Sequence, residues 1–345
     1  HHQKKEENMS RKKAVVAALA LGAVAALGLS ACSGTSGTSP SQSAKSGKAG
    51  GFIQIIVNDP SNPYWLTEGD VAQKEAESLG YTASVAASKA DVNTESTIID
   101  TAIAKHAAGI ILDPANAEGS IGNIKRAMAK NIPVFLVNAE IDQQGVALGQ
   151  LVSNNAQGAA LGAQQWIKAA GTKGNYAELF GLPSDNNAAT RSNGYKTVIS
   201  QYPDWKKVAQ QTANWDRALG QQKMQSILQA HPDINAVIAG NDEMALGAIA
   251  AIKQAGKKLS ADGISNGIVV GGFDGSPDAV DAIKAGDLAY TVLQPVAVFA
   301  KKAVQELDEY IRTGKKPAQE KQSFDCILIT KDNVDKMTAP FTFSG

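Results

Sequence analysis

The sequence predicts an α/β fold built from two doubly wound parallel sheets. From Phe52 onward, short β-branched runs alternate with amphipathic stretches, and strands that each need a covering helix form a parallel sheet. The alternation starts again after LVSNNAQG at residues 151–158, so the chain contains two α/β units of similar build. Its 345 residues suffice for two domains of roughly 100–200 residues each.

The elements of both units follow from apolar periodicity. The predicted strands of the first unit, FIQIIV, TASVAA, GIILD and IPVFLVN, begin at residues 52, 82, 109 and 132, and its helices run over about 65–79, 95–105 and 121–129. Gly80 follows the first of these helices, a position where glycine commonly ends a helix. In the second unit, the strands NYAELFG, KVAQQTA, INAVIAG and IVVGGFD begin at residues 175, 207, 234 and 268, and the helices run over about 159–170, 188–201, 218–230 and 244–255.

The N-terminus has the composition of a secretory signal peptide. Basic residues at 11–13 precede an uncharged run over 14–29, and the small residues LSAC occupy 29–32. At 16 residues the run is shorter than the ~20 of a membrane-spanning helix, although a true membrane anchor is the alternative. We expect a leader over 1–31, in which residues before Met9 are upstream sequence outside the fold.

LSAC resembles the lipobox of bacterial lipoproteins, whose cysteine carries the lipid and begins the mature chain. The resemblance implies that Cys32 is the lipid attachment site and that residues 32–50 form a flexible tether. The expected location is therefore outside the cytoplasm, anchored to the outer face of the cell membrane, or periplasmic in a Gram-negative cell. Cys326 is then expected to be a small buried residue without a disulfide partner in the folded part.

Polar residues gather where the predicted strands end. They are Asn58 and Asp59, Asp113, Asn138, Asn241 and Asp242, and Asp274. In open α/β sheets a ligand binds outside the carboxyl ends of the strands, so these residues are expected to face a cleft. The alternative for each single residue is a turn former or a helix N-cap.

Several segments resemble the ribose-type periplasmic sugar-binding proteins of ABC transporters, which are related to the LacI repressor core. These segments are NDPSNPYW, NIPVFLVN, RSNGY, HPDINAVIAGNDEMALGA, VVGGFDGSPDAVDAIKAGDLAYTVLQ and TGKKP. The resemblance implies two doubly wound parallel-sheet lobes joined by a three-crossover hinge, with the ligand in the interlobe cleft. The crossovers are expected near Ser153, Gln294 and Asp325. The lobes would then comprise 51–153 plus 295–325 and 154–294 plus 326–345.

The resemblance also implies which residues bind the ligand. Asn62, Tyr64 and Trp65 would contact it from the first lobe. Trp215 would cover it from the second lobe, where Asn241, Asp274 and Gln294 would bind hydroxyl groups. Amides and carboxylates suit sugar hydroxyls, and aromatic rings pack against the apolar face of a sugar.

Two departures from the ribose binders change the expected ligand. Those proteins have an Asp-Arg pair where this chain has Asn138 and Ala139, and a second sugar-contacting Arg is replaced by Ala189. Arg191 matches an Arg whose role is expected to be structural. The loss of two guanidinium groups removes donors that a ribose site needs. Because Asn138 retains an amide and Glu140 adds an acceptor, a sugar alcohol or another pentose-sized sugar is the expected ligand.

The implied function is capture of a monosaccharide or sugar alcohol by hinge closure and delivery to an ABC permease, by a monomer without cofactor or metal. Only a ligand that contacts both lobes favours the closed form. A receptor that presents the ligand for sensing is an alternative that the sequence does not separate from transport. A cleft enzyme is disfavoured, since nucleophile and nucleotide-binding motifs are missing and His106 and His231 are isolated.

A DNA-binding role is also disfavoured by the sequence. Lys plus Arg and Asp plus Glu number 33 each, so no net positive field attracts nucleic acid. A repressor with this core would need a helix-turn-helix before residue 51, and that region is predicted to be a signal and a linker.

Overall fold

The computed structural model describes residues 50–345, which all belong to one compact unit. The predicted leader and tether, and with them Cys32, lie outside the described residues, except for Gly50. Among residues 50–345, no helix combines the length and the apolar character that crossing a bilayer requires.

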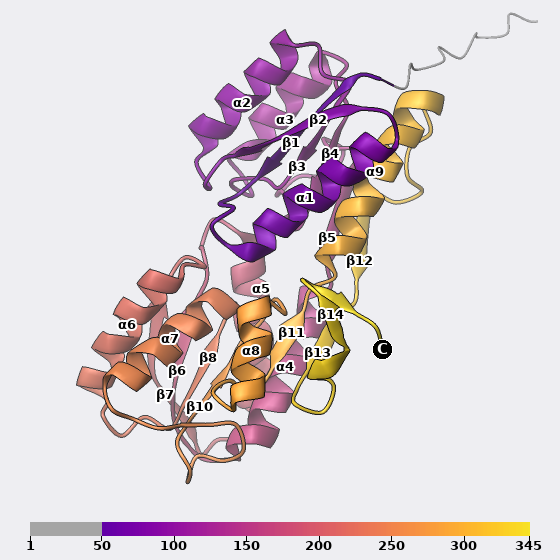
Figure 1. The fold of residues 1–345 in the computed structure, drawn as a ribbon. Helices are drawn as coiled ribbons and strands as arrows, with labels where there is room; N and C mark the ends of the chain where they lie inside the picture. The colour runs from indigo at the N-terminus through magenta and orange to yellow at the C-terminus, as the bar shows by residue number, and fades with distance from the viewer. Residues whose placement is uncertain (1–49) are drawn as a thin grey trace, which may run out of the picture. The chain divides into compact units, whose positions relative to one another are not determined.

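The first lobe is a six-stranded parallel sheet with the strand order β12-β5-β4-β3-β1-β2 (Figure 1). Its strands are β1 (Phe52–Val57), β2 (Thr82–Ala87), β3 (Gly109–Leu112), β4 (Val134–Val137), β5 (Gly149–Ser153) and β12 (Lys321–Phe324). Helices α1 (Pro63–Ser78) and α9 (Val296–Thr313) pack together against the sheet, and α2 (Val92–Ala104) packs with α3 (Ser120–Ala129).

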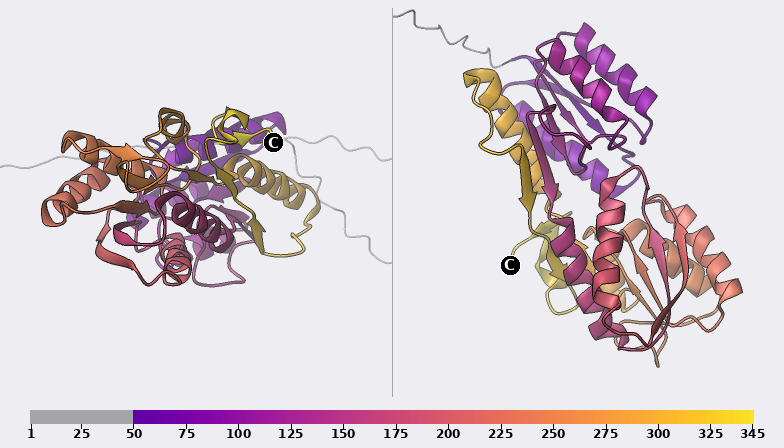
Figure 2. Two further views of the ribbon diagram at one scale, coloured as in Figure 1. Left: turned by 90° about the horizontal axis from the view of Figure 1, so that it is seen from below. Right: turned by 180° about the vertical axis from the view of Figure 1, so that it is seen from behind.

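The second lobe is a five-stranded parallel sheet with the order β7-β6-β8-β10-β9. Its strands are β6 (Gly174–Phe180), β7 (Trp205–Thr212), β8 (Ala236–Ala239), β9 (Leu259–Ser260) and β10 (Ile268–Gly271). The view from behind in Figure 2 shows α4 (Asn155–Ala170) and α5 (Asn186–Ile199) side by side. Helix α6 (Arg217–Ala230) packs with α7 (Asp242–Gln254), which also contacts α8 (Pro277–Ala285).

The chain passes between the two sheets three times. It leaves the first sheet after β5, returns from β11 (Thr291–Leu293) through α9 to β12, and leaves again to β13 (Ile327–Ile329), which pairs antiparallel with β11. The remainder forms the 3₁₀ turn η1 (Val334–Lys336) and the hairpin of β14 (Met337–Ala339) and β15 (Thr342–Phe343). The lobe boundaries expected near Ser153, Gln294 and Asp325 stay predictions, and each falls in one of these connections.

The cores of both sheets explain why these strands could be recognised from the sequence. Strands β3, β4 and β8 are buried along their whole length, as expected of parallel strands with helices on both faces.

Cys326 is 4% exposed and is a free thiol, and its burial raises the pKa of that thiol to about 12. It therefore behaves as the small buried residue that the sequence predicts.

Candidate ligand-binding site

A small cavity of about 20 Å³ lies where the two lobes meet, outside the carboxyl ends of the strands. Residues of both lobes line it: Asn62, Tyr64, Trp65, Asn138, Asp185, Asn187, Arg191, Trp215, Asn241, Asp274 and Gln294. Of the ligand-binding residues that the resemblance implied, all except Glu140 are in this set, whereas the strand-end residues Asn58, Asp59, Asp113 and Asp242 are not. Whether the lining residues bind ligand stays a prediction.

A chain of hydrogen bonds crosses the cavity from one lobe to the other. The Asn138 amide donates to Asp113 Oδ2 over 2.9 Å, and the Gln294 amide donates to Asp274 Oδ1 over 2.6 Å. Both amides then turn their oxygens toward the Tyr64 hydroxyl, at 2.9 Å for Asn138 and 3.3 Å for Gln294. A phenol has a single proton to donate, so the two amide oxygens compete for it.

The Tyr64 hydroxyl stays protonated and is a fixed donor. Burial raises its pKa well above the ordinary value, and the negative charges of Glu68 and Asp274 raise it further. Edge-to-face contact with Phe341, which precedes β15 in the C-terminal hairpin, holds the Tyr64 ring with the two ring centres 5.5 Å apart.

Helix N-termini position several of the polar residues. Asn62 caps α1 by accepting from Tyr64 N at 3.0 Å, Asp185 caps α5 by accepting from Asn187 N at 2.9 Å, and Asn241 caps α7 by accepting from Met244 N at 3.0 Å. A polar residue after a strand was interpreted either as a helix cap or as a cleft residue. Asn241 is therefore both. Capping also explains why α7 begins two residues before its predicted start.

Two indoles enclose the cavity, and two glycines make room for one of them. Trp65 and Trp215 are 7% and 5% exposed, and the indole Nε1 of each is buried without a hydrogen-bond partner among the described residues. A Cβ atom on Gly181 would lie 2.3 Å from the Trp215 ring, and one on Gly240 would lie 3.0 Å from it. The Asn241 amide donates to the Trp215 carbonyl over 3.2 Å and holds this segment in place.

Arg191 supplies the positive charge of the site, which was not expected from the sequence. The guanidinium lies over the Phe273 ring at 4.0 Å and over the Trp215 ring at 5.0 Å. It donates to Asn155 Oδ1 and to the Gly240 carbonyl, each over 2.9 Å, and lies 3.9 Å from Asp274. Its expected structural role is therefore real, but it also lines the cavity.

At residue 189 the chain has an alanine where ribose binders have a sugar-contacting Arg, and the effect of this replacement on the ligand stays a prediction. Ala189 is exposed on α5 and does not line the cavity. Arg191, two residues farther along the helix, lines the cavity, so the site has one guanidinium although two arginines of the ribose binders are replaced.

Glu140, which was expected to contribute an acceptor, does not lie with the other expected residues around the cavity. Its carboxylate lies 3.2 Å from the ammonium group of Lys321 on β12 and does not line the cavity. The backbone at Asn138 has a φ of 68°, a left-handed conformation that turns the chain after β4. Asn138 therefore faces the cavity while Glu140 reaches the β12 edge of the sheet.

Asp185, Asn187 and Arg191 line the cavity but were not predicted. The sequence could have indicated Asp185 and Asn187, because both are polar residues that follow the carboxyl end of β6. The Asn187 amide also donates to the Asn138 carbonyl over 2.9 Å and thereby joins the lobes. Two further bonds do the same, from Ala117 N to the Ser184 carbonyl at 3.0 Å and from the Asn186 amide to Asp142 at 2.7 Å.

Two carboxyl groups of the first lobe lie behind the cavity wall. Glu68 on α1 is fully buried, and its pKa is raised well above the ordinary value by that burial and by the charge of Asp113. Burial also raises the pKa of Asp113 to about 8, although the hydrogen bond from Asn138 lowers that pKa. This pair therefore retains a proton at neutral pH.

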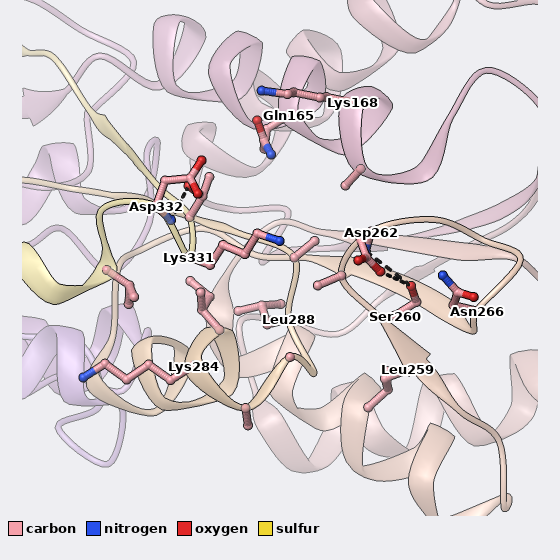
Figure 3. Close-up of a pocket in the computed structure, with 18 of the residues that line it drawn as sticks. Gln165, Lys168, Leu259, Ser260, Asp262, Asn266, Lys284, Leu288, Lys331 and Asp332 are labelled. Atoms are coloured by element: carbon pink, nitrogen blue, oxygen red, sulfur yellow. Dashed lines mark hydrogen bonds between the residues drawn. The ribbon is translucent and has the colours of Figure 1, made fainter.

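A larger cavity of about 800 Å³ lies elsewhere on the second lobe (Figure 3). Figure 3 shows its lysines and carboxylates spread over separate elements, with Ser260 and Asp262 hydrogen-bonded to each other at 3.4 Å. None of the described residues that line it is aromatic. It therefore lacks the stacking surfaces and convergent polar groups that the interlobe cavity has.

A family match agrees with this geometry. Residues 53–316 match the family model described as "Periplasmic binding protein domain". The chain belongs to the periplasmic binding protein family. The predicted resemblance and the predicted two-lobe α/β fold are both confirmed.

This periplasmic binding protein has relatives that are named for the sugars they import. It is 46% identical to the D-apiose import binding protein of Paraburkholderia graminis over 289 residues, 84% of this chain and 90% of the relative. It is 31% identical to the ribose import binding protein of Escherichia coli over 280 residues, 81% of this chain and 90% of the relative. The solved periplasmic component of the arabinose transporter of Shewanella sp. ANA-3, bound to α- and β-L-arabinofuranose, is 26% identical with a TM-score of 0.76, covering 82% of this chain and 93% of that one.

Proposed function

We propose that this periplasmic binding protein captures a five-carbon sugar between its lobes and delivers it to an ABC permease, with D-apiose as the first candidate. The observation that carries the proposal is the interlobe cavity, in which two indoles and convergent polar side chains from both lobes meet. The import binding proteins of D-apiose and ribose, among its relatives, support the same class of ligand.

The chemistry of the cavity suits a polyhydroxylated ring. Asp185 and Asp274 offer acceptors, Arg191 offers donors, and the amides of the site offer both. Charge-assisted hydrogen bonds of this kind are the stronger ones. The indoles of Trp65 and Trp215 provide apolar faces for the C–H groups of the ring and exclude water.

Capture requires the cavity to enlarge and the hydrogen bonds that cross it to be exchanged. A volume of about 20 Å³ holds roughly one water molecule, and a five-carbon sugar is several times larger. The sugar hydroxyls would replace the bonds that Tyr64 makes to Asn138 and Gln294. Since these partners come from both lobes, the bound sugar would stabilise the closed arrangement of the hinge.

The choice of D-apiose over D-ribose rests on two observations. The chain shares 46% identity with a D-apiose import binding protein and 31% with a ribose import binding protein. Asn138 and Ala139 also replace the Asp-Arg pair expected of ribose binders, and of the residues that the structure describes only Arg191 brings a guanidinium to the cavity. A site that lacks a donor for a particular hydroxyl discriminates against the sugar that presents it.

Binding without chemical conversion is part of the proposal. His106 and His231 do not line the cavity, and the Asp274 carboxylate accepts a bond from Gln294. The relatives are import binding proteins rather than enzymes. The proposal also includes a monomer outside the cytoplasm, a lipid anchor at Cys32 and a membrane permease as partner.

A sugar panel tests the proposal. Thermal shift and calorimetry would compare D-apiose, D-ribose, L-arabinose, xylitol and myo-inositol with the purified protein. A ligand at 100 times its Kd stabilises by about 2.7 kcal/mol, which raises the melting midpoint measurably. We expect D-apiose to bind and D-ribose to bind at least tenfold more weakly. Tight binding of D-ribose or of a polyol without binding of D-apiose would overturn the choice of sugar. No response to any compound of the panel would overturn the proposed class of ligand.

Matched variants connect the panel to the cavity. Asp274→Asn changes a cavity residue, whereas Glu140→Gln changes a carboxylate that is bonded to Lys321 outside it. We expect Asp274→Asn to weaken sugar binding by about 1–3 kcal/mol and Glu140→Gln to leave it within twofold of the unchanged protein. Equal losses in the two variants would place the ligand elsewhere.

A further inference from the structure

Asp274 is held in a conformation that its own residue type disfavours. Its φ is 137°, in the region that non-glycine residues rarely adopt, and the following Gly275 has a φ of 82°. The turn is pressed against β11, because a Cβ atom on Gly275 would lie 2.7 Å from the Leu293 side chain and 2.9 Å from its Cα. The Asp274 backbone is bonded to this segment, from Asp274 N to the Val292 carbonyl over 2.8 Å and from Gln294 N to the Asp274 carbonyl over 3.1 Å, and the strained turn needs further restraint on its neighbours.

Asp242 holds the backbone on both sides of Asp274. The Asp242 amide donates to the carbonyl of Phe273, the residue before Asp274, over 2.7 Å. The side-chain Oδ2 of Asp242 accepts from the backbone N–H groups of Gly275 and Ser276, the two residues after Asp274, at 2.9 and 2.8 Å. Each hydrogen bond joins Asp242 to a neighbour of Asp274 and leaves the Asp274 carboxylate free to face the cavity.

The second carboxylate oxygen of Asp242 is also fixed. Oδ1 accepts from the Thr291 hydroxyl at 2.7 Å, and that hydroxyl oxygen accepts in turn from Gly275 N at 3.0 Å. Gly272 provides the space, since a Cβ atom there would lie 2.3 Å from Asp242 Oδ1. Asp242 is fully buried at the first turn of α7, where the helix dipole stabilises a negative charge.

Asp242 does not line the cavity, so its effect on a ligand is indirect. We infer that Asp242 is a positioning residue that sets the ligand specificity of the site by locking Asp274 in its strained conformation. The inference rests on the proposed function of the cavity. With Asp242 in place, the Asp274 carboxylate is presented at one orientation, 2.6 Å from the Gln294 amide. A sugar is then selected by whether it places a hydroxyl at that point.

Asp242→Asn is the sharpest substitution, because it preserves size while replacing one acceptor oxygen by an NH₂ group. If the amide nitrogen takes the place of Oδ2, it faces the N–H groups of Gly275 and Ser276 and repels them. If it takes the place of Oδ1, it still finds an acceptor in Thr291 but leaves a neutral, weaker acceptor for the turn. In both cases the restraint on Asp274 weakens.

A double-mutant cycle separates positioning from general stability. Binding of D-apiose would be measured by calorimetry for the unchanged protein, Asp242→Asn, Asp274→Asn and the double variant. We expect Asp242→Asn to weaken binding about tenfold alone and less than twofold when Asp274 is already Asn, because residues that act through each other are not additive. Equal losses in both backgrounds would show a merely structural role and overturn the inference.

A crystal structure of Asp242→Asn gives a readout that needs no sugar. We expect the turn at 274–275 to relax and the Asp274 carboxylate to leave the Gln294 amide, and an unchanged turn would overturn the inference. Failure of the unchanged protein to bind any sugar of the panel would instead count against the proposed function. Should Asp242→Asn not fold, Thr291→Val, which loses the hydroxyl, would be run through the same cycle against Thr291→Ser, which keeps it.

Discussion

The phenol oxygen of Tyr64 on the first lobe lies 3.3 Å from Oε1 of Gln294 on the second. The Tyr64 proton has a second acceptor in Asn138 at 2.9 Å, so the bond across the lobes is the longer of the two. A ligand hydroxyl that donates to Gln294 would relieve this competition. A polyhydroxylated ligand would therefore satisfy these oxygens better than the two lobes satisfy each other's.

Replacing Tyr64 by phenylalanine should weaken sugar binding more than it weakens the fold. The variant keeps the ring that packs on Phe341 but removes the one donor that the Asn138 and Gln294 oxygens share. We expect a loss of about 1–3 kcal/mol in sugar affinity and of about 1 kcal/mol in the free energy of unfolding. Calorimetry and urea denaturation measure the two quantities, and an affinity within twofold of the unchanged protein would count against a role of this hydroxyl.

The fold was predictable because parallel strands leave a strong local signal. FIQIIV and TASVAA coincide with β1 and β2, since each is a short β-branched or apolar run bounded by turn residues. Nothing in the local pattern reveals that β12, with its polar sequence KQSF, pairs with β5 from some 170 residues away. Its place follows from the path of the chain through α9, which only the tertiary structure shows.

The site was predictable to the extent that it follows strand ends. Asn138, Asn241 and Asp274 were found in this way, because a polar residue after a buried strand is visible in the sequence. The inward direction of Arg191 and the outward direction of Glu140 depend on helix phase and on the left-handed turn at Asn138. Neither is a property of local composition.

Asn241 should contribute to stability and to binding through different atoms. Its oxygen caps α7, and its amide nitrogen donates to the Trp215 carbonyl. Asn241→Ala removes both, so we expect it to lower the free energy of unfolding by about 1 kcal/mol and to weaken sugar binding. Asn241→Ser restores a cap without the amide, and it should recover the stability but not the affinity. Recovery of both would show that only the cap matters.

Gly181 should be intolerant of a side chain because of Trp215. A Cβ atom there would lie 2.3 Å from the indole, so Gly181→Ala must displace the ring that closes the cavity. We expect this overpacking to cost about 1–3 kcal/mol of sugar affinity, which calorimetry measures.

A matched glycine provides the control for this substitution. Gly122 lies in α3, and a Cβ atom added to it would meet no described atom within 4 Å, so Gly122→Ala should leave sugar binding unchanged. Its free energy of unfolding should rise by about 0.5–1 kcal/mol, because alanine favours a helix interior over glycine. Equal affinity in the Gly181 and Gly122 variants would contradict the role given to the indole.

The buried pair of Glu68 and Asp113 should make the protein less stable as the pH rises. Burial raises the pKa of Asp113 to about 8 from an ordinary value near 4, so the folded protein binds more protons than the unfolded chain over that range. Stability from this group is then complete below about pH 4 and is lost as the pH rises toward 8. Glu68→Gln removes one of the two charges, and we expect it to raise the free energy of unfolding at pH 8 by about 1–2 kcal/mol relative to its effect at pH 5. Urea denaturation at pH 5 and pH 8 measures this difference in the free energy of unfolding.

Glu77→Gln changes an exposed position on the same helix and is the control, since it should show no such difference. A difference of the same size in both variants would mean that the buried pair does not cause it.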